Sequence, residues 1–240
     1  MDASRLIRGT RKFLKRTRCG AVIVAAGNAA RIGGIDKVTV PLGGVPVLLR
    51  AVQAFSDSNM IDEIVIVTRR ELIPQVNSLC GAVPKVTAVV AGGKTRTESV
   101  SLGLNALSDQ VTHCAIHDGA RPLVSEQVIA RTVQSAMTCG AAAPAIPVKD
   151  TVKVAHGDVV RKTPNRDDLY AVQTPQVFDF DILRGALKKA AEDHITVTDD
   201  CSAVEHMGFK VKLVTGEERN IKITTPLDLK IAEVFLEDKT

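Results

Sequence analysis

Short apolar segments alternate along the chain with segments whose apolar residues recur at helical spacing. The continuous apolar runs cover residues 21–26, 63–68, 85–93, 113–119 and 141–148. Between them, apolar residues three and four positions apart, such as Val128, Ile129 and Val133, predict amphipathic helices. Because strands that are apolar throughout are buried on both faces, the alternation predicts an α/β fold with a Rossmann-like, mostly parallel sheet covered by helices.

Residues that favour helix ends refine this prediction. Ser125 is a suitable N-cap for one helix, and Pro226 stands at the first position of the last helix, where proline is favoured. Other helices are expected at 47–55, at 71–79, near 179–191 and near 198–207. A further helix is expected where the apolar residues Val100, Leu104 and Leu107 align. Two further apolar segments, "KVKLV" (210–214) and "NIKIT" (220–224), are predicted to be strands.

The pattern changes after Pro147. Residues 148–170 alternate in polarity around "HGD", a favourable hairpin turn, but they contain few apolar residues for a core element. We therefore expect a β-hairpin arm that leaves the main body. Since an arm that cannot bury itself often packs on a second chain, this segment predicts a homodimer.

The length of 240 residues fits one large domain, expected over 19–240, after a basic tail at 1–18. The tail holds seven Lys and Arg against one acidic residue, whereas the rest of the chain has a slight acidic excess. A near-neutral body argues against a general nucleic-acid-binding surface. The tail is compatible with a disordered chain end, a targeting peptide or a polyanion-binding arm.

Composition narrows the remaining classes of protein. No apolar run approaches the ~20 residues of a membrane span, so no membrane partner is expected. With six Phe, one Tyr and no Trp, the chain is poorly suited to binding by base stacking. The five cysteines are odd in number and form no CxxC, which predicts reduced, mostly buried thiols in a cytoplasmic protein and no zinc site.

Polar, glycine-containing clusters follow the predicted strands. They are "AAGNAAR" after the first strand, "AGGKTRTES" after the third and "HDGARP" after the fourth. In an open parallel sheet these clusters meet at one edge, where ligands bind. Small residues let backbone N–H groups approach a ligand, and the cations Arg31 and Lys37 in the first cluster favour an anion. The sequence therefore predicts a nucleotide-phosphate site.

Two common phosphate motifs do not fit these clusters. "GGKT" at 92–95 resembles the end of a P-loop, but the glycine that makes the turn is replaced by Ala88. "AAGNAARIGG" is not GxGxxG, because Ala29 stands at the second glycine and no acidic residue ends the second strand before Thr68. Both motifs are therefore weak explanations of the site.

A resemblance to a known family explains the clusters better. The segment from "AVIVAAGNAARIGG" onward resembles the opening of nucleotidylyltransferases that join a sugar or polyol phosphate to a nucleoside triphosphate. "AGGKTRTESV", "IHDGARPLV", "PVKDTVK", "QTPQVF", "TDDCSAVE" and "NIKIT" then follow in the order and spacing of the 2-C-methyl-D-erythritol 4-phosphate cytidylyltransferases. The resemblance runs from about Cys19 to Glu237. It implies transfer of CMP from CTP to methylerythritol phosphate, with release of pyrophosphate, in non-mevalonate isoprenoid precursor biosynthesis.

The resemblance also implies roles for residues at the nucleotide end of the site. Arg31 and Lys37 match the family's transition-state cations, although each could be an ordinary surface charge. Asp118 matches a residue that holds Mg²⁺ or the ribose and substrate hydroxyls. Its alternative role is purely structural, as the aspartate of a turn that enters a helix. The positions that match contacts to the triphosphate, the ribose and cytosine are Ala25, Ala26, Gly27, Gly93 and Ser99.

At the acceptor end, Lys222 and Arg166 match the family's pair that positions the attacking phosphate, and Arg121 and Thr174 match supporting contacts. Taken alone, Lys222 could be an exposed strand edge and Arg166 part of a charged loop. Arg166 and Thr151 lie on the expected arm, which in the family reaches into the neighbour's site. The resemblance therefore implies a composite site across a dimer.

Some features depart from the family pattern. Val24, Ala29 and the segment 36–38 differ from the usual residues of the first loop, which motivates a second hypothesis, a catalytically silent nucleotide-binding relative. A third is a ribitol-5-phosphate cytidylyltransferase, which shares most of the motifs but usually differs in "HDGARP". His117 and Asp118 are neighbours on a strand and face opposite ways, so a catalytic His–Asp dyad is not expected.

Overall fold

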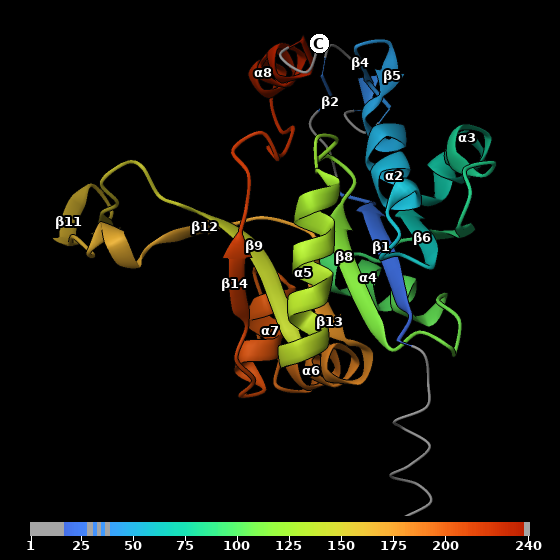
Figure 1. Ribbon diagram of the computed structural model, residues 1–240. Helices are drawn as coiled ribbons and strands as arrows, with labels where there is room; N and C mark the ends of the chain where they lie inside the picture. Colours follow the sequence, from blue (N-terminus) through green and yellow to red (C-terminus); the bar gives the residue numbers. More distant parts are fainter. Residues whose placement is uncertain (1–16, 28–30, 33–34, 37–38, 238–240) are drawn as a thin grey trace, which may run out of the picture.

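The computed structural model describes residues 17–27, 31–32, 35–36 and 39–237. Its centre is an eight-stranded sheet in the order β12-β9-β13-β8-β1-β6-β7, with β14 also paired to β9 (Figure 1). The strands are β1 (Cys19–Ala25), β6 (Glu63–Thr68), β7 (Val86–Ala91), β8 (His113–Asp118), β9 (Ala141–Pro147), β12 (Tyr170–Val172), β13 (Gln176–Asp179) and β14 (Lys212–Thr215). This mixed sheet confirms the predicted α/β fold class.

Strand directions explain why the sheet is only mostly parallel. β1 pairs in parallel with both β6 and β8, β6 pairs in parallel with β7, and β14 pairs in parallel with β9. β13 runs antiparallel between β8 and β9, and β12 runs antiparallel to β9. The five predicted central strands are confirmed. β13 was not predicted, because four residues are too short to carry a clear periodic signal.

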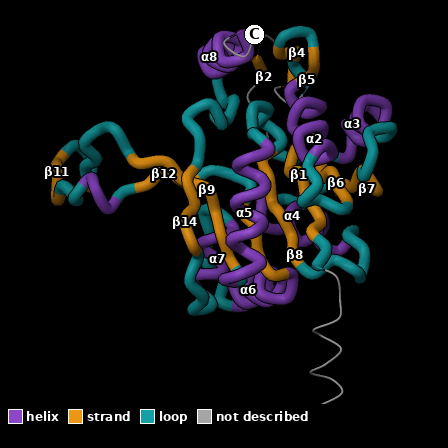
Figure 2. The backbone as a smooth tube through the Cα atoms, in the orientation of Figure 1, coloured by secondary structure: helices purple, strands orange, loops and turns teal. Residues whose placement is uncertain are grey.

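Helices cover both faces of the sheet (Figure 2). They are α2 (Val47–Asp57), α3 (Ile73–Cys80), α4 (Arg96–Asn105), α5 (Glu126–Cys139), α6 (Phe180–Glu192), α7 (Asp200–His206) and α8 (Pro226–Glu237), with short 3-10 turns at Arg70–Leu72 and Arg166–Asp168. The predicted helix starts are correct: the Ser125 hydroxyl accepts the backbone N–H of Val128, and α8 begins at Pro226.

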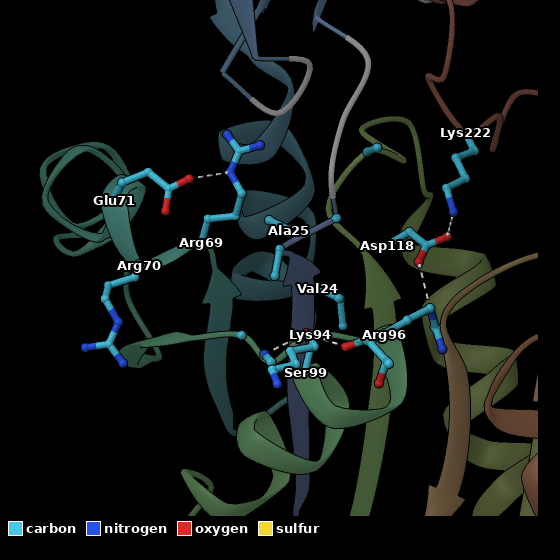
Figure 3. A pocket seen from close by; sticks show the side chains of 16 residues that line it. Val24, Ala25, Arg69, Arg70, Glu71, Lys94, Arg96, Ser99, Asp118 and Lys222 are labelled. Atoms are coloured by element: carbon cyan, nitrogen blue, oxygen red, sulfur yellow. Dashed lines mark hydrogen bonds and ion pairs between the residues drawn. The ribbon is translucent and has the colours of Figure 1, made fainter. Parts of the chain in front are cut away.

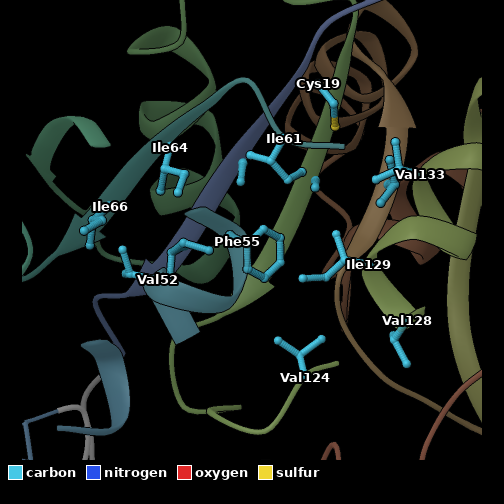
Figure 4. Packing of buried hydrophobic residues seen from close by; sticks show 14 of the residues in the cluster. Cys19, Val52, Phe55, Ile61, Ile64, Ile66, Val124, Val128, Ile129 and Val133 are labelled. Carbon is cyan, nitrogen blue, oxygen red and sulfur yellow. The ribbon is translucent and has the colours of Figure 1, made fainter. Parts of the chain in front are cut away.

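Alternate residues of the strands feed two separate cores. Ala21 and Ile23 of β1 face the core formed with α2, α3 and α5, whereas Val22 faces the core formed with α4, α6 and α7. Phe55 of α2 is fully buried in the first core, among aliphatic side chains from both helices and strands (Figure 4). The two apolar layers hold the central strands rigid, which fixes the edge where the strands end.

The segment "NIKIT" is not a strand, so that prediction was wrong. Residues 220–224 have no ladder partner, although Ile223 is fully buried. The Asn220 side chain bonds to Gln173 and to the backbone of Thr174, and the N–H of Ile223 donates to the carbonyl of Ala120 at 2.9 Å. These single anchors replace the repeated hydrogen bonds of a sheet.

The predicted hairpin arm is present. β10 (Val154–His156) and β11 (Val159–Lys162) pair antiparallel around Gly157, and the hairpin lies apart from the main body (Figure 1). Every residue of these two strands is exposed, including Val159 at 65%. The chain rejoins the sheet at β12. The part of this arm in dimer formation remains a prediction.

The first loop contains two short hairpins that we did not predict. β2 (Arg31–Ile32) pairs with β3 (Ile35–Asp36), and β4 (Pro41–Leu42) pairs with β5 (Val45–Pro46). The second turn is Gly43–Gly44, with φ of 54° and 76°. Because only glycine adopts such angles readily at both positions, "GG" was a usable hairpin signal in the sequence.

The cysteines agree with the prediction of mostly buried thiols. Cys19, Cys80, Cys114 and Cys201 are buried, Cys139 is exposed, and none forms a disulfide.

Across the described part of the chain, no helix combines the length and apolar character needed to cross a membrane. Residues 1–16 of the basic tail lie outside the described residues, so the alternatives for that segment stay open.

Candidate active site

A pocket of about 510 Å³ lies where β1, β6, β7 and β8 end (Figure 3). This is the edge at which the sequence placed the ligand. The pocket is lined by Val24, Ala25, Ala26, Gly27, Arg69, Arg70, Glu71, Gly92, Gly93, Lys94, Thr95, Arg96, Ser99, Asp118, Ala120 and Lys222. Small residues and cations dominate this lining, which suits a large polyanion that must approach the backbone closely.

Tight packing between two loops explains the small residues. A Cβ atom on Gly92 would lie 2.4 Å from the Cβ of Ala26 and 2.8 Å from the Ser99 hydroxyl, so no side chain fits there. The loop after β7 therefore lies directly against the end of β1. Ala25, Ala26 and Gly27, the predicted triphosphate contacts, form the pocket wall beside it.

The loop that holds Gly93 is fixed by its own hydrogen bonds. The Ser99 hydroxyl accepts the N–H of Gly93 at 3.1 Å and donates to the carbonyl of Thr95 at 2.9 Å. Thr95 caps α4 by accepting the N–H of Glu98. Ser99 is 2% exposed, and both hydrogen bonds of its hydroxyl are made within this loop, so the hydroxyl stabilises the loop conformation. Gly93 and Ser99 both line the pocket, and their predicted contacts to the base and ribose remain predictions.

Asp118, at the end of β8, is the electrostatic centre of the pocket. Its carboxylate lies 2.9 Å from Lys222 Nζ, 3.7 Å from Arg96 Nε and 3.8 Å from Arg121 Nε. Burial alone would raise the pKa of Asp118, but Lys222, Arg96 and Arg121 together lower it to about 2. The carboxylate is therefore ionised at any physiological pH.

Arg96 lines the pocket and was not among the predicted site residues. Its guanidinium bridges two carboxylates, with Nη1 2.7 Å from Asp200 Oδ2. Figure 3 shows Arg96 paired with the other carboxylate, Asp118. Asp200 is 1% exposed, and burial raises its pKa even though Arg96 opposes that change. Arg96 stood within the quoted motif "AGGKTRTES", so its place in a pocket loop was available as a signal. Lys94, Arg69 and Arg70 also line the pocket and were not predicted.

His117 has no part in the pocket. Its ring is fully buried, lies 4.7 Å from the Phe55 ring, and contacts the Arg121 carbonyl and the Thr174 hydroxyl. Burial lowers the pKa of His117 to about 4, so the ring is neutral at pH 7. His117 and Asp118 face opposite ways, as expected, and form no catalytic dyad.

Thr174 and Arg121 lie behind Asp118 rather than in the pocket lining. The Thr174 hydroxyl accepts the N–H of Asp118 at 3.1 Å, and Arg121 Nη1 donates to the carbonyl of Asn220 at 2.6 Å. Both are largely buried, and burial lowers the pKa of Arg121 while Asp118 opposes that change. The fold thus brings Asp118, Lys222, Arg121 and Thr174 together from three separate segments: the end of β8 with the turn after it, the link between β12 and β13, and the loop after β14.

Other predicted residues are not brought to this pocket within one chain. Arg166 and Thr151 are exposed on the arm, where Arg166 donates to the carbonyl of Lys149 at 3.2 Å. Lys37 lies outside the described residues, and for Arg31 only the backbone, in β2, is described. The roles predicted for these four side chains therefore remain predictions.

Metal-binding capacity in the described residues is limited. None of their His, Cys, Asp and Glu side chains form a group of three or more that could hold an ion. Two carboxylates line the pocket: Asp118, which is ionised, and Glu71, which lies 3.1 Å from Arg69. A single carboxylate suits Mg²⁺, which commonly binds through one or two carboxylates together with substrate phosphates.

Comparison with known proteins agrees with this geometry. The sequence model of the family described as IspD, 2-C-methyl-D-erythritol 4-phosphate cytidylyltransferase, matches residues 19–238. The protein of that name from Caldanaerobacter subterraneus is 43% identical over 225 residues, which cover 90% of this chain and 97% of that protein. The one from Symbiobacterium thermophilum is 42% identical, with 91% and 92% covered.

Solved structures give the same result. The crystal structure of 4-diphosphocytidyl-2C-methyl-D-erythritol synthase from Anaerococcus prevotii superposes with a TM-score of 0.83 at 34% identity, covering 92% of this chain and 96% of that one. The structure of 2-C-methyl-D-erythritol 4-phosphate cytidylyltransferase from Thermus thermophilus gives 0.75 at 32% identity, with 90% and 98% covered.

Proposed function

Since the chain belongs to the 2-C-methyl-D-erythritol 4-phosphate cytidylyltransferase family, we propose how its residues carry out that family's reaction. The reaction is CTP-dependent cytidylyl transfer to methylerythritol phosphate, a step in isoprenoid precursor biosynthesis. An acceptor phosphate oxygen attacks the α-phosphorus of CTP, the bond to the β-phosphate breaks, and pyrophosphate leaves.

This chemistry requires no general base. The acceptor phosphate is already largely ionised at neutral pH, because its second pKa is ~6. The barrier comes from bringing two polyanions into line and from the charge that develops on the α-phosphate and on the leaving pyrophosphate. A site for this reaction therefore needs cations on several sides of a rigid pocket, and proton-transfer groups such as His117 can be absent from it.

The wall of small residues is assigned to CTP. Ala25, Ala26 and Gly27 offer backbone groups to the triphosphate, while Gly93 and Ser99 border the space for cytosine and ribose. Arg31 and Lys37 supply positive charge to the triphosphate oxygens. Recognition by backbone groups is consistent with the few aromatic residues in the chain.

The end of the pocket at Lys222 is assigned to the acceptor. The Lys222 side chain is 41% exposed, whereas that of its partner Asp118 is 12% exposed, so the ammonium group is the accessible member of the pair. Lys222 holds the acceptor phosphate, with Arg121 and Thr174 in support. Arg166 and Thr151 of the partner subunit complete the site in a homodimer joined through the arm.

Asp118 is the residue that fits a divalent cation. Its low pKa keeps the carboxylate ionised, and it borders the pocket between the two assigned ends. Mg²⁺ bound there together with phosphate oxygens would neutralise charge that develops on the triphosphate. The buried, unpaired thiols support the predicted cytoplasmic location.

The observation that carries this proposal is the convergence of Lys222, Arg96 and Arg121 on Asp118, beside a wall of small residues at the sheet edge. The test is pyrophosphate release by the purified protein from CTP and Mg²⁺, with methylerythritol phosphate or ribitol 5-phosphate as acceptor. We expect release with the first acceptor. Release only with ribitol 5-phosphate would identify that compound as the acceptor. CTP binding without release of pyrophosphate would indicate a catalytically silent relative.

A further inference from the structure

Lys222 lies in a segment that the sheet does not support. Residues 216–225 have no ladder partner, yet Lys222 Nζ lies 2.9 Å from Asp118. A lysine on an unsupported loop loses much side-chain and backbone freedom when it is held in one place. Something outside the sheet must therefore fix the backbone on each side of Lys222.

On one side the anchor is Ile223. Its N–H donates to the carbonyl of Ala120 at 2.9 Å, and its side chain is fully buried in a small core with Leu42 and Val47. This contact ties the loop to the segment just after β8. It fixes the position of the loop, but among the described residues no hydrogen bond joins Ile223 to Arg121 or Thr174.

On the other side the anchor is Asn220, which is also fully buried. Its Nδ2 group donates to the carbonyl of Thr174 at 2.9 Å and to Gln173 Oε1 at 3.2 Å. Its backbone carbonyl accepts Arg121 Nη1 at 2.6 Å. One residue therefore contacts Thr174 and Arg121 directly and lies two positions before Lys222.

Gln173 extends this connection. Its Nε2 group donates to the carbonyl of Glu217 at 2.8 Å, and its Oε1 accepts the N–H of Glu217 at 3.2 Å. The two amide side chains thus hold the loop before Lys222 against the link between β12 and β13, which carries Thr174. Since both acceptors of Asn220 are oxygens, the site requires an NH₂ group at this position.

We propose that Asn220 is a positioning residue for the acceptor phosphate: it holds Lys222, Thr174 and Arg121 in one arrangement, and Gln173 holds Asn220. This inference rests on the proposed function of these three residues. It extends the site to two buried amides that touch neither substrate. It also separates the two ends of the pocket, because no hydrogen bond among the described residues joins Asn220 to Gly93, Ser99 or the end of β1.

The variant that tests this is Asn220→Asp. It keeps the size of the side chain but places a carboxylate oxygen against two acceptor oxygens, so both hydrogen bonds are lost. We expect kcat/KM for the acceptor to fall by about 10²-fold through a misplaced Lys222, with a raised acceptor KM, while the Kd for CTP measured by calorimetry without acceptor stays within about twofold of the wild type.

Two further variants keep the test decisive. Ser58→Ala removes buried hydrogen bonds to Glu126 and Met60 far from the pocket, and should lower Tm while leaving the acceptor KM unchanged. Gln173→Met removes both polar atoms of the Gln173 amide, and should raise the acceptor KM without weakening CTP binding. If Asn220→Asp does not fold, the Gln173→Met variant provides the test in its place.

The outcomes separate this inference from the proposed function. An inactive wild type would remove the proposed function itself. With an active wild type, an unchanged acceptor KM in folded Asn220→Asp or Gln173→Met would show that the amides are merely structural. Equal losses of CTP affinity and acceptor use would also overturn the inference, because they would indicate general damage to the pocket.

Discussion

Lys222 Nζ lies 2.9 Å from Asp118 Oδ2, which joins a loop near the carboxyl end of the chain to the last residue of a central strand. Two arginines, Arg96 and Arg121, share the same carboxylate. In the proposed mechanism, Asp118 therefore keeps compensating charge when Lys222 turns to an incoming phosphate. This allows the accessible ammonium group to exchange partners without leaving a buried carboxylate unpaired.

Removal of the Lys222 charge should impair the acceptor step more than nucleotide binding. For Lys222→Met we expect a loss of about 10²-fold or more in kcat/KM for the acceptor, as for removal of a preorganised charge partner. Steady-state pyrophosphate release measures this. Lys188→Met, at an exposed lysine paired with Glu192 on α6, is the matched control and should behave as wild type.

Arg31 and Lys37 should be needed for turnover. Arg31→Ala and Lys37→Ala are each expected to lower kcat by about 10²-fold or more, because charge that develops on the triphosphate loses its partner. Single-turnover assays at saturating CTP separate this effect from weaker binding. Wild-type rates in either variant would mean that the residue is an ordinary surface cation.

Arg96 should also contribute to stability, because it neutralises Asp200, which is 1% exposed. Arg96→Met leaves that carboxylate buried without its partner and should reduce the free energy of unfolding by about 3 kcal/mol. Urea unfolding measures the change. The double variant Arg96→Met/Asp200→Leu should recover most of this loss, whereas two additive losses would show that the pair is not coupled.

Stability should depend on pH through His117. Burial lowers the pKa of this residue to about 4, so between an unfolded pKa near 6.5 and that value the unfolded chain binds a proton that the folded chain does not. The free energy of unfolding should therefore fall as pH decreases across this window, by up to about 3 kcal/mol from this group. From about one pH unit above 6.5, His117 should contribute no further change in the free energy of unfolding.

Urea unfolding of the wild type and of His117→Gln at several pH values tests whether His117 causes this pH dependence. The variant should lose most of the slope between pH 6.5 and 4, while His206→Gln, at an exposed histidine paired with Asp193, should retain it. Equal slopes in the wild type and His117→Gln would assign the pH dependence to other groups.

A site shared between subunits should show complementation. Lys222→Ala and Arg166→Ala are each expected to be nearly inactive alone. Coexpressed in equal amounts, they should regain about a quarter of wild-type activity, because half of the dimers are mixed and each mixed dimer has one intact site. No recovery, or an active monomer in light scattering, would place the whole site within one chain.

Much of the fold follows from neighbouring residues. The apolar runs that became β1, β6 and β8 and the capped helix after Ser125 were predicted because burial pattern and capping depend on positions a few residues apart. The same local order put the polar clusters at strand ends. Asp118 and Gly93 could therefore be placed at a shared edge before the structure was known.

The sequence by itself determined an α/β fold, a ligand edge and, through its motifs, a family. Only the tertiary structure decided that β13 lies between β8 and β9, that 220–224 is a loop, and that Arg96 bridges Asp118 and Asp200. The physical reason is distance along the chain. Periodicity and caps are local signals, whereas ion pairs and the Asn220 anchor join residues far apart in sequence, which only packing brings together.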